Sequence, residues 1–435
     1  MYEVCLLNNG TDAATSICLK QLHLQNSVWL RCITMIITGL FILCICMCGT
    51  YGLEVVNQWN FLNFDFPDNF DTKSFRPENT VFTGIEVTDD RIFVALPSIR
   101  DGVPAALTSI PRNTPPGSSP VLQAYPNWSF QGAANNLSCS ALISVYRVRT
   151  DSCNRLWVLD AGTVTSIDNF RRVCRPKLLA FDLSTNEVVR TILFPDDVLR
   201  PNSGFINFVI DENVQGKCDS AFFYVADSLA PGIIVYDGIK EQTWRVSHPS
   251  MFPNPDHSSY NIGGDAFTLM DGIIGFAHSP PACYIVFPGI GYRQVTTDTK
   301  IFSIPTSALT KGPQRELEEL PVAVAGRKSS QGLALTLNPT DNTLFFSPFS
   351  ETSVASWNVL TNEQRVIASD PTSLQFTSEL RWKGEESTLW LASSRFHKFF
   401  KRTVTPSEVN LRIMRIPFQT PSTAISNFLG SRLYF

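Results

Sequence analysis

The sequence is poor in charged residues. Only 17% of its 435 residues are Asp, Glu, Lys or Arg, below the roughly 25% of an average globular protein. The 35 basic and 39 acidic residues leave a net charge of −4, and no basic block is present. Nucleic-acid binders need clustered Lys and Arg, so we expect no nucleic-acid partner. A disordered chain is excluded as well, because 44% of the residues are apolar.

Several sequence signatures are also absent. Long runs of Ala, Leu, Glu and Lys, which are typical of helical proteins, do not occur, whereas Phe (31) and Pro (28) are abundant. The lack of a G-x-S-x-G element argues against an α/β hydrolase. The cysteines beyond residue 52 contain no C-x-x-C pair, which argues against a zinc site. We therefore expect neither a metal nor another cofactor.

The N-terminal region contains an uncharged apolar run. Residues 32–48 have 17 such residues, fewer than the roughly 20 that span a bilayer and suited to a signal-peptide core. Small residues at 49–52 fit cleavage before Leu53. An uncleaved signal-anchor is the alternative, because 31 residues precede the run, and a start at Met35 would remove that excess. We expect residues 1–52 to be leader and signal peptide, and residues 53–435 to be one secreted, extracellular domain without stable membrane insertion.

The remaining cysteines fit an oxidising compartment. Six of the 11 Cys lie in or before the apolar run, and five follow it. Four of these five lie within 80 residues of one another and are the candidates for two disulfides, with the pairing left open: Cys139, Cys153, Cys174 and Cys218. Cys283 is then the unpaired one. The sequons at Asn127 and Asn136 are candidate glycosylation sites and support export.

A short apolar strand recurs along the chain. Its centres are 45 to 67 residues apart: Phe93, Trp157, Tyr224, Ile285, Phe345 and Trp390. A second strand precedes each copy, a third follows most of them, and polar turn residues separate the strands, as in antiparallel hairpins. The unit of about 60 residues therefore contains three to four strands and occurs six times.

Six such units predict an all-β fold. Four-stranded antiparallel sheets arranged radially around a central channel form a six-bladed β-propeller. The last unit is short, so we expect residues 53–64 to supply its outer strand and close the ring. A pair of β-sandwiches would also show short strands, but the six-fold spacing over the whole mature chain favours the propeller. The recurring tryptophans are then expected to pack between blades.

The order of these strand motifs resembles the yellow / major royal jelly protein family of insects. The likeness covers about residues 53–416 and is carried by segments such as DRIFVALPSIRDGVPAAL (90–107), CSALISVYRVRTDSCNRLWVLDAG (139–162), FFYVADSLAPGIIVYD (222–237), DGIIGFAHSP (271–280) and LWLASSRFHK (389–398). The resemblance implies a secreted six-bladed propeller. Members of the family resemble dopachrome-converting enzymes, pigmentation factors, salivary amine binders or nutritional proteins, so the subfamily decides the function.

The chain departs from the family pattern in two places. Pro281-Ala282-Cys283 stands where a basic residue is common before the second strand of the fourth blade. A segment rich in Pro and Ser, residues 110–120, follows the first blade.

Three groups of polar residues are weak candidates for a functional site. His248 and His257, with Asp256 and Asp265, fit no familiar ligand spacing, so a solvated loop is the better interpretation. Inward acids that would suit a propeller lactonase are few: Glu86, Asp211 and Glu379. Asp160 and Asp227 end equivalent strands in successive units, which favours capping of turns over catalysis.

Ligands of propellers usually bind at one mouth of the central channel. The candidates on the inner strands are Asn207, His278, Gln331, Phe376 and Glu379. Phe376 would stack on an aromatic ring, Glu379 would pair with a protonated amine, and Asn207 and Gln331 would bind catechol hydroxyls. The alternative is that these side chains simply fill the channel.

The resemblance, taken together with the candidate channel residues, implies three possible functions. The first is binding of a small aromatic amine or catechol-type ligand in pigmentation, melanin or cuticle biology. The second is a dopachrome-type isomerase, which needs a base and an acid within hydrogen-bond reach of the ring. Glu379 and His278 are the candidate catalytic pair. The third is a structural or nutritional extracellular protein with an unused channel.

Overall fold

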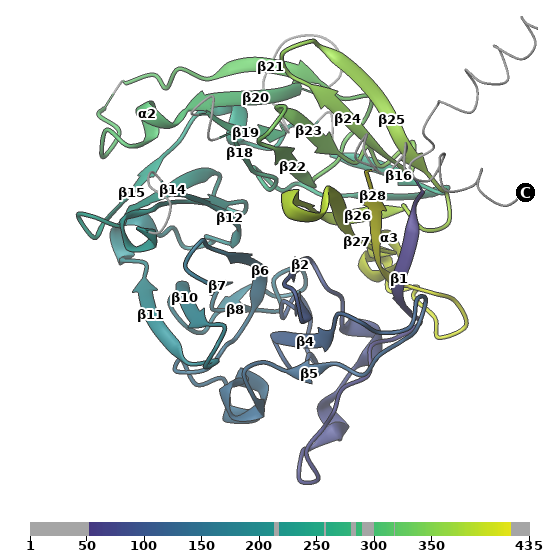
Figure 1. Cartoon of the computed structure of the whole chain (residues 1–435). Helices are drawn as coiled ribbons and strands as arrows, with labels where there is room; N and C mark the ends of the chain where they lie inside the picture. The colour runs from purple at the N-terminus through teal and green to yellow at the C-terminus, as the bar shows by residue number, and fades with distance from the viewer. Residues whose placement is uncertain are drawn as a thin grey trace, which may run out of the picture. The chain divides into compact units, whose positions relative to one another are not determined.

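The computed structural model describes residues 52–212, 217–255, 258–279, 284–288, 300–316 and 318–418 (Figure 1). Residues Tyr51–Phe435 cluster as one compact unit. The expected signal peptide lies outside the described residues, as does Cys283. Within the described stretches no helix is both long and apolar enough to cross a membrane.

The strands form six four-stranded antiparallel sheets around a ring, which confirms the six-bladed β-propeller (Figure 1). The first three blades are β2 (Gly84–Val87), β3 (Arg91–Ala95), β4 (Leu107–Pro111) and β5 (Gln123–Ala124); β6 (Val145–Thr150), β7 (Arg155–Asp160), β10 (Lys177–Asp182) and β11 (Val188–Leu193); and β12 (Phe205–Asp211), β13 (Phe222–Asp227), β14 (Gly232–Asp237) and β15 (Gln242–Val246). The other three are β18 (Ala277–Ser279), β19 (Tyr284–Pro288), β20 (Lys300–Pro305) and β21 (Ala323–Arg327); β22 (Leu335–Asn338), β23 (Thr343–Phe346), β24 (Ser353–Asn358) and β25 (Glu363–Ser369); and β26 (Phe376–Lys383), β27 (Thr388–Ser394), β28 (Leu411–Pro417) and β1 (Glu54–Trp59). The first strand of each blade contacts the first strands of its neighbours, so β2, β6, β12, β18, β22 and β26 surround the central channel.

The N-terminal strand closes the ring, as expected for residues 53–64. β1 pairs antiparallel with β28, from Glu54 opposite Arg415 to Trp59 opposite Leu411. Trp59 is buried and its indole N–H donates to the carbonyl of Pro120 at 2.9 Å. The sixth blade is therefore built from both ends of the propeller.

The Pro- and Ser-rich segment lies within the first blade, between β4 and β5, and not after it. Its residues bind β1: the N–H of Gln58 donates to the Ser118 carbonyl at 3.0 Å, and that of Gly117 donates to the Val56 carbonyl at 2.9 Å. The prediction was wrong because β5 has only two residues and gives no recognisable strand pattern. The segment therefore hydrogen-bonds to the edge of β1 that does not pair with β28, so that β1 lies between the two.

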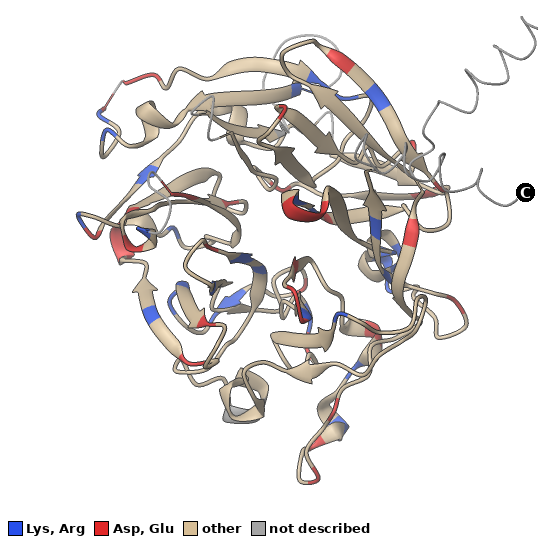
Figure 2. Cartoon of the chain, in the orientation of Figure 1, with Lys and Arg blue, Asp and Glu red and all other residues tan. Residues whose placement is uncertain are grey.

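Apolar side chains fill the space between successive blades. Trp157 of the second blade packs on Phe223 of the third, with ring centroids 4.5 Å apart, and Trp244, Trp357 and Trp390 are also buried. These contacts confirm the expected inter-blade packing. Because both faces of most sheets are covered, few positions are left for charge, and Figure 2 shows charges of both signs distributed around the ring.

Asp160 and Asp227 hold backbone, which supports the structural interpretation. Asp160 accepts hydrogen bonds from the N–H groups of Ile143, Ser144 and Gly162 at 2.9–3.0 Å. Asp227 accepts from Gly204 at 2.9 Å and from Ala230 at 3.1 Å. Each carboxylate therefore fixes the turn after its strand and the entry to the inner strand of its blade.

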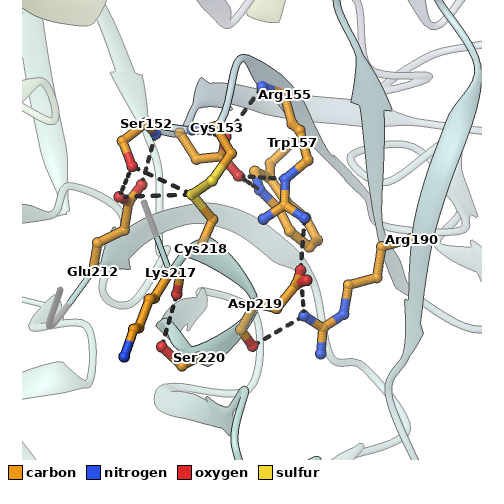
Figure 3. The surroundings of a disulfide bond; sticks show 11 residues. Ser152, Cys153, Arg155, Trp157, Arg190, Glu212, Lys217, Cys218, Asp219 and Ser220 are labelled. Carbon is orange, nitrogen blue, oxygen red and sulfur yellow. Dashed lines mark hydrogen bonds and ion pairs between the residues drawn. A yellow bond between two sulfur atoms is a disulfide. The ribbon is translucent and has the colours of Figure 1, made fainter. Parts of the chain in front are cut away.

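Two disulfides reinforce the second blade. Cys139 pairs with Cys174, and Cys153 pairs with Cys218. The second bond joins the β6–β7 turn to η6 (Cys218–Ser220) of the third blade, beside the ion pair of Arg155 with Asp219 at 2.6 Å (Figure 3). All four predicted cysteines are thus in disulfides.

Small elements lie in the connections between strands, both within blades and between them. Two hairpins are β8 (Thr163–Val164) with β9 (Arg171–Arg172), and β16 (Ser259–Ile262) with β17 (Asp265–Thr268). The α-helices of the described residues are α2 (Thr306–Leu309) and α3 (Phe396–Lys401), and 3₁₀ turns include η5 (Asp196–Val198) and η7 (Pro249–Met251). The β16–β17 hairpin contacts α3 of the sixth blade.

Candidate functional site

The middle of the channel is filled by a buried ionic network. Glu379 of β26 is 3% exposed and pairs with Arg147 and Arg149 of β6, each at 3.1 Å. Arg149 also donates to the side-chain oxygen of Asn207 at 3.0 Å, and the amide of Asn207 donates to the Ile274 carbonyl at 2.9 Å. Burial lowers the pKa of Arg149 to about 10, so its guanidinium still carries its charge at neutral pH. These polar groups mainly satisfy one another.

A second set of polar contacts lies among the inner strands. Glu86 of β2 pairs with Arg381 of β26 at 2.8 Å. Asp211 of β12 lies 3.5 Å from His278 of β18 and accepts from the Tyr224 hydroxyl at 3.1 Å. Burial lowers the pKa of His278, although Asp211 opposes that change, so the imidazole is mainly neutral at pH 7.

The structure does not bring Glu379 and His278 together. Among the described residues no hydrogen bond or ion pair joins the two side chains, because Glu379 faces two arginines and His278 faces Asp211. A base held by two cations accepts a proton poorly. The catalytic pair therefore stays a prediction that these contacts disfavour.

A half-enclosed pocket of about 90 Å³ lies where the inner strands begin. Residues from five of the inner-strand segments and from the connection before β18 line it, so it occupies one mouth of the channel. Its apolar walls are Ile99, Tyr146, Ile167, Ile206, Leu229, Leu269, Ile274, Leu333, Phe376 and Phe396. Its charged lining residues are Arg147 and Asp271. We call it the Asp271 pocket.

Asp271 lies in the connection between β17 and β18. Among the described residues no hydrogen bond or ion pair reaches its carboxylate, and burial alone raises its pKa to about 6. Burial raises the pKa of Tyr146 to about 12, and the charge of Asp271 contributes to that rise and to the raised pKa of Tyr260. These effects place the carboxylate near two phenol groups. A carboxyl group with such a pKa takes up and releases protons near neutral pH.

The predicted channel residues lie at different distances from this pocket. Phe376 lines it and stacks between Phe349 and Phe396, with centroids 4.5 and 4.7 Å apart. Asn207 and Glu379 lie in the ionic network instead, next to the pocket residues Ile206 and Ser378. The amide of Gln331 donates to the carbonyl of Ser259 in the β16–β17 hairpin at 3.2 Å.

The β16–β17 hairpin extends from the connection that carries Asp271 to α3. Asp265 pairs with Lys401 at 2.5 Å and lies 3.8 Å from His397. Phe267 packs on Phe400 with centroids 5.5 Å apart. Burial lowers the pKa of His397 to about 4, so this imidazole is neutral at pH 7.

No metal site emerges from the described residues. Asp265 is paired as above, and His248 accepts from the N–H of Ser250 at 3.2 Å, whereas Asp256 and His257 lie outside those residues. Among the described residues, the one cluster of possible metal ligands contains Asp151 with Cys153 and Cys218, whose sulfurs are bonded to each other. Both sequon asparagines, Asn127 and Asn136, are exposed.

Sequence reasoning missed Asp271, the most distinctive group of the pocket. The available signal was one acidic residue, in LMDGIIGFA, within an otherwise apolar stretch. The sequence shows that Asp271 is isolated among apolar residues, but the other lining residues of the pocket come from nine separate segments of the chain.

Comparison with known proteins shows which family the chain is similar to. The sequence model described as "Major royal jelly protein" matches residues 143–423. Dopaminechrome tautomerase of Drosophila melanogaster is 29% identical over 387 residues, which are 83% of this chain and 81% of that protein. Protein yellow of Drosophila erecta is 28% identical over 389 residues, or 86% and 70%. The structure of virginiamycin B lyase from Staphylococcus aureus aligns with a TM-score of 0.42 and 12% identity over 79% of this chain and 98% of that one, too distant to inform function.

Proposed function

Since this chain belongs to the yellow / major royal jelly protein family, whose members are linked to pigmentation, we propose that it binds a small aromatic amine or catechol-type ligand in the Asp271 pocket. One observation carries the proposal: a carboxylate that has no partner among the described residues lies in an otherwise mostly apolar pocket at the mouth of the propeller channel. Pockets that are largely apolar with a few convergent polar groups are typical ligand sites.

The chemistry of the walls matches such a ligand. A protonated amine would give the Asp271 carboxylate the partner that it lacks, in surroundings where a buried charge is costly unless it is paired. Apolar walls and Phe376 would contact the ring. The volume of about 90 Å³ is below the roughly 150 Å³ of a cavity that encloses benzene, so an indole would extend through the open side.

We also propose that the protein acts outside the cell, in pigmentation or cuticle biology. Two disulfides, the apolar run at residues 32–48 and exposed sequon asparagines support export and glycosylation. Mass spectrometry of the secreted protein would test both, since it reads the mature N-terminus and the glycans at Asn127 and Asn136. A mature chain that begins at Met1 and carries no glycan would contradict them.

Calorimetric titration with dopamine and serotonin at pH 7.4 tests the binding function. We expect saturable binding by the wild type and at least tenfold weaker binding by Asp271→Asn, because a charge-assisted hydrogen bond is lost. Asp197→Asn makes the same chemical change at an exposed position in η5 and should bind like the wild type. Absence of binding for both amines would reject the proposal and leave a structural or nutritional role.

A tautomerase is the second candidate. The observation that favours it is a carboxyl group with a pKa of about 6 beside the site where a ring would lie, in a chain similar to a dopaminechrome tautomerase. Tautomerisation moves protons from ring carbon to oxygen without gain or loss of atoms or electrons, so one carboxyl group able to take and return a proton would serve. Decay of dopaminechrome absorbance no faster than in buffer would eliminate it, and Asp271→Asn should abolish any acceleration.

A further inference from the structure

The charges around the Asp271 pocket are unequally satisfied. Arg147, the lining cation, lies 3.1 Å from Glu379 and donates to the carbonyls of Thr83 at 2.6 Å, Tyr146 at 2.9 Å and Ser378 at 3.0 Å. Asp271, the lining anion, has no partner among the described residues. The positive charge of Arg147 is already paired with Glu379, so a ligand carboxylate entering this pocket would compete with Glu379 for it.

The deeper cation is also occupied. Arg149 is not part of the pocket lining, and its two terminal nitrogens are held by Glu379 and Asn207. Burial raises the pKa of Asp271, and among the described residues no ion pair joins its carboxylate to either guanidinium. The charge that the pocket leaves unpaired is therefore negative.

From this asymmetry we infer that Asp271 makes the pocket selective for aromatic amines without a carboxylate over their amino-acid counterparts. The inference rests on the proposed binding function and specifies its ligand class. An amine supplies the missing positive charge. The corresponding amino acid supplies the same charge together with a second anion, which Asp271 repels across mainly apolar surroundings and which has to compete with Glu379 for the positive charge of Arg147.

Two matched ligand pairs isolate this effect: dopamine with L-DOPA, and serotonin with 5-hydroxytryptophan. Members of a pair share the ring and the amine and differ by one carboxylate. With the wild-type full chain at pH 7.4, calorimetry should show at least tenfold tighter binding of each amine. Asp271→Asn should reduce the preference to less than threefold, and Asp197→Asn should keep it. Because Asp271 has no partner in the part of the chain that the structure describes, the variant is expected to fold, which a thermal melt verifies.

A second measurement uses pH. The groups that face Asp271 are Tyr146, Tyr260 and Arg147. Burial raises the pKa of both phenols far above pH 7.4, Arg147 is paired with Glu379, and His397 of nearby α3 stays largely neutral between pH 7.4 and pH 5. Protonation of Asp271 at pH 5 should therefore weaken the wild-type preference to about that of Asp271→Asn at pH 7.4.

The outcomes separate the inference from the proposed function. Equal affinity within both pairs, tighter binding of the amino acids, or an undiminished preference in Asp271→Asn would overturn the selectivity while binding itself stands. Failure of every ligand to bind would overturn both.

Discussion

At the scale of single residues, two carboxylates in one channel have opposite surroundings. Glu379 is buried with Arg147 and Arg149, whereas Asp271 lines a mostly apolar pocket and has no partner within the described stretches. A buried acid that is paired has a structural role, because its negative charge stabilises the positive charges of its neighbours. Lack of pairing leaves the acid available for a ligand or a proton. The inner-strand position that made Glu379 attractive as a base is the same position that surrounds it with arginines.

The first prediction concerns Glu379→Gln. The change leaves two buried guanidinium groups without their counter-charge, and removal of one partner from a buried ion pair typically costs about 3–5 kcal/mol. Urea unfolding should show a loss of that size. Asp271→Asn is the matched control, since it neutralises an unpaired acid and should cost little. Equal stability of Glu379→Gln and the wild type would contradict the structural role.

The second prediction concerns Lys328, in the connection between β21 and β22. Its amine is buried, donates to the Gly332 carbonyl at 2.7 Å, and burial lowers its pKa from 10.5 to about 7. Between these two values the unfolded chain holds a proton that the folded chain has released, so stability rises with pH. The rise reaches about 1.4 kcal/mol per pH unit, and below pH 7 the full penalty persists.

Urea unfolding at pH 7 and pH 9 checks this effect. The wild type should gain about 2 kcal/mol relative to Lys328→Met over that interval. Lys311→Met removes an exposed lysine and should follow the wild type. Parallel pH profiles for the wild type and Lys328→Met would show that the amine is not desolvated.

At the scale of elements, the connections tie blades together as much as the strands do. The second and third blades are joined by three contacts between the β6–β7 connection with the start of β7 and the β12–β13 connection that contains η6. These are the Cys153–Cys218 bond, the ion pair of Arg155 with Asp219, and the hydrogen bond from Ser152 to Glu212 (Figure 3). Covalent and ionic contacts thus coincide at one blade boundary. The boundary should survive loss of the disulfide, but at reduced stability.

The third prediction follows from that boundary. In the chain-entropy description, a disulfide stabilises by about 3 kcal/mol for a 15-residue loop and about 4.7 for 100 residues. The Cys153–Cys218 bond spans 65 residues and the Cys139–Cys174 bond spans 35. Replacing either pair by Ser should therefore cost about 4 kcal/mol, slightly more for the longer loop. Calorimetric melting of both double variants measures the costs, and an unchanged melting temperature for either would refute the estimate.

The strands themselves were largely predictable from the sequence. Apolar runs such as RLWVLDAG, bounded by turn residues, are local patterns, and their recurrence fixed both the blade count and the closing role of residues 53–64. The two-residue β5 carries no such pattern, which explains why residues 110–120 were misplaced. The strand pattern also identified which residues lie on the inner strands, but not which side chains of other blades they contact.

At the scale of the whole molecule, the site depends on the ring. Asp271, Tyr146 and Phe396 are separated by more than 100 residues and meet only because six blades converge on one axis. A single sequence does not show which segments meet at the channel, since each segment alone has the pattern of an ordinary strand or connection. Phe376 was identified because a single aromatic side chain at the start of an inner strand must face a channel mouth. The partners of Glu379 and the pocket around Asp271 depend on closure of the ring.

The last prediction concerns that closure. Removal of residues 53–60 deletes β1, which leaves the edge of β28 unpaired and the 110–120 segment without its partner. Exposed edges pair with other chains, so the truncated protein should form oligomers, detected by size-exclusion chromatography with light scattering.

A synthetic peptide of residues 53–61 added in trans should restore the monomer by strand addition. A peptide with Trp59→Ala is the matched control, because the indole is buried and donates to the Pro120 carbonyl. Since the pocket is built on the closed ring, rescue should also restore amine binding, and a truncated protein that binds dopamine as tightly as the full chain would show that the pocket does not need closure.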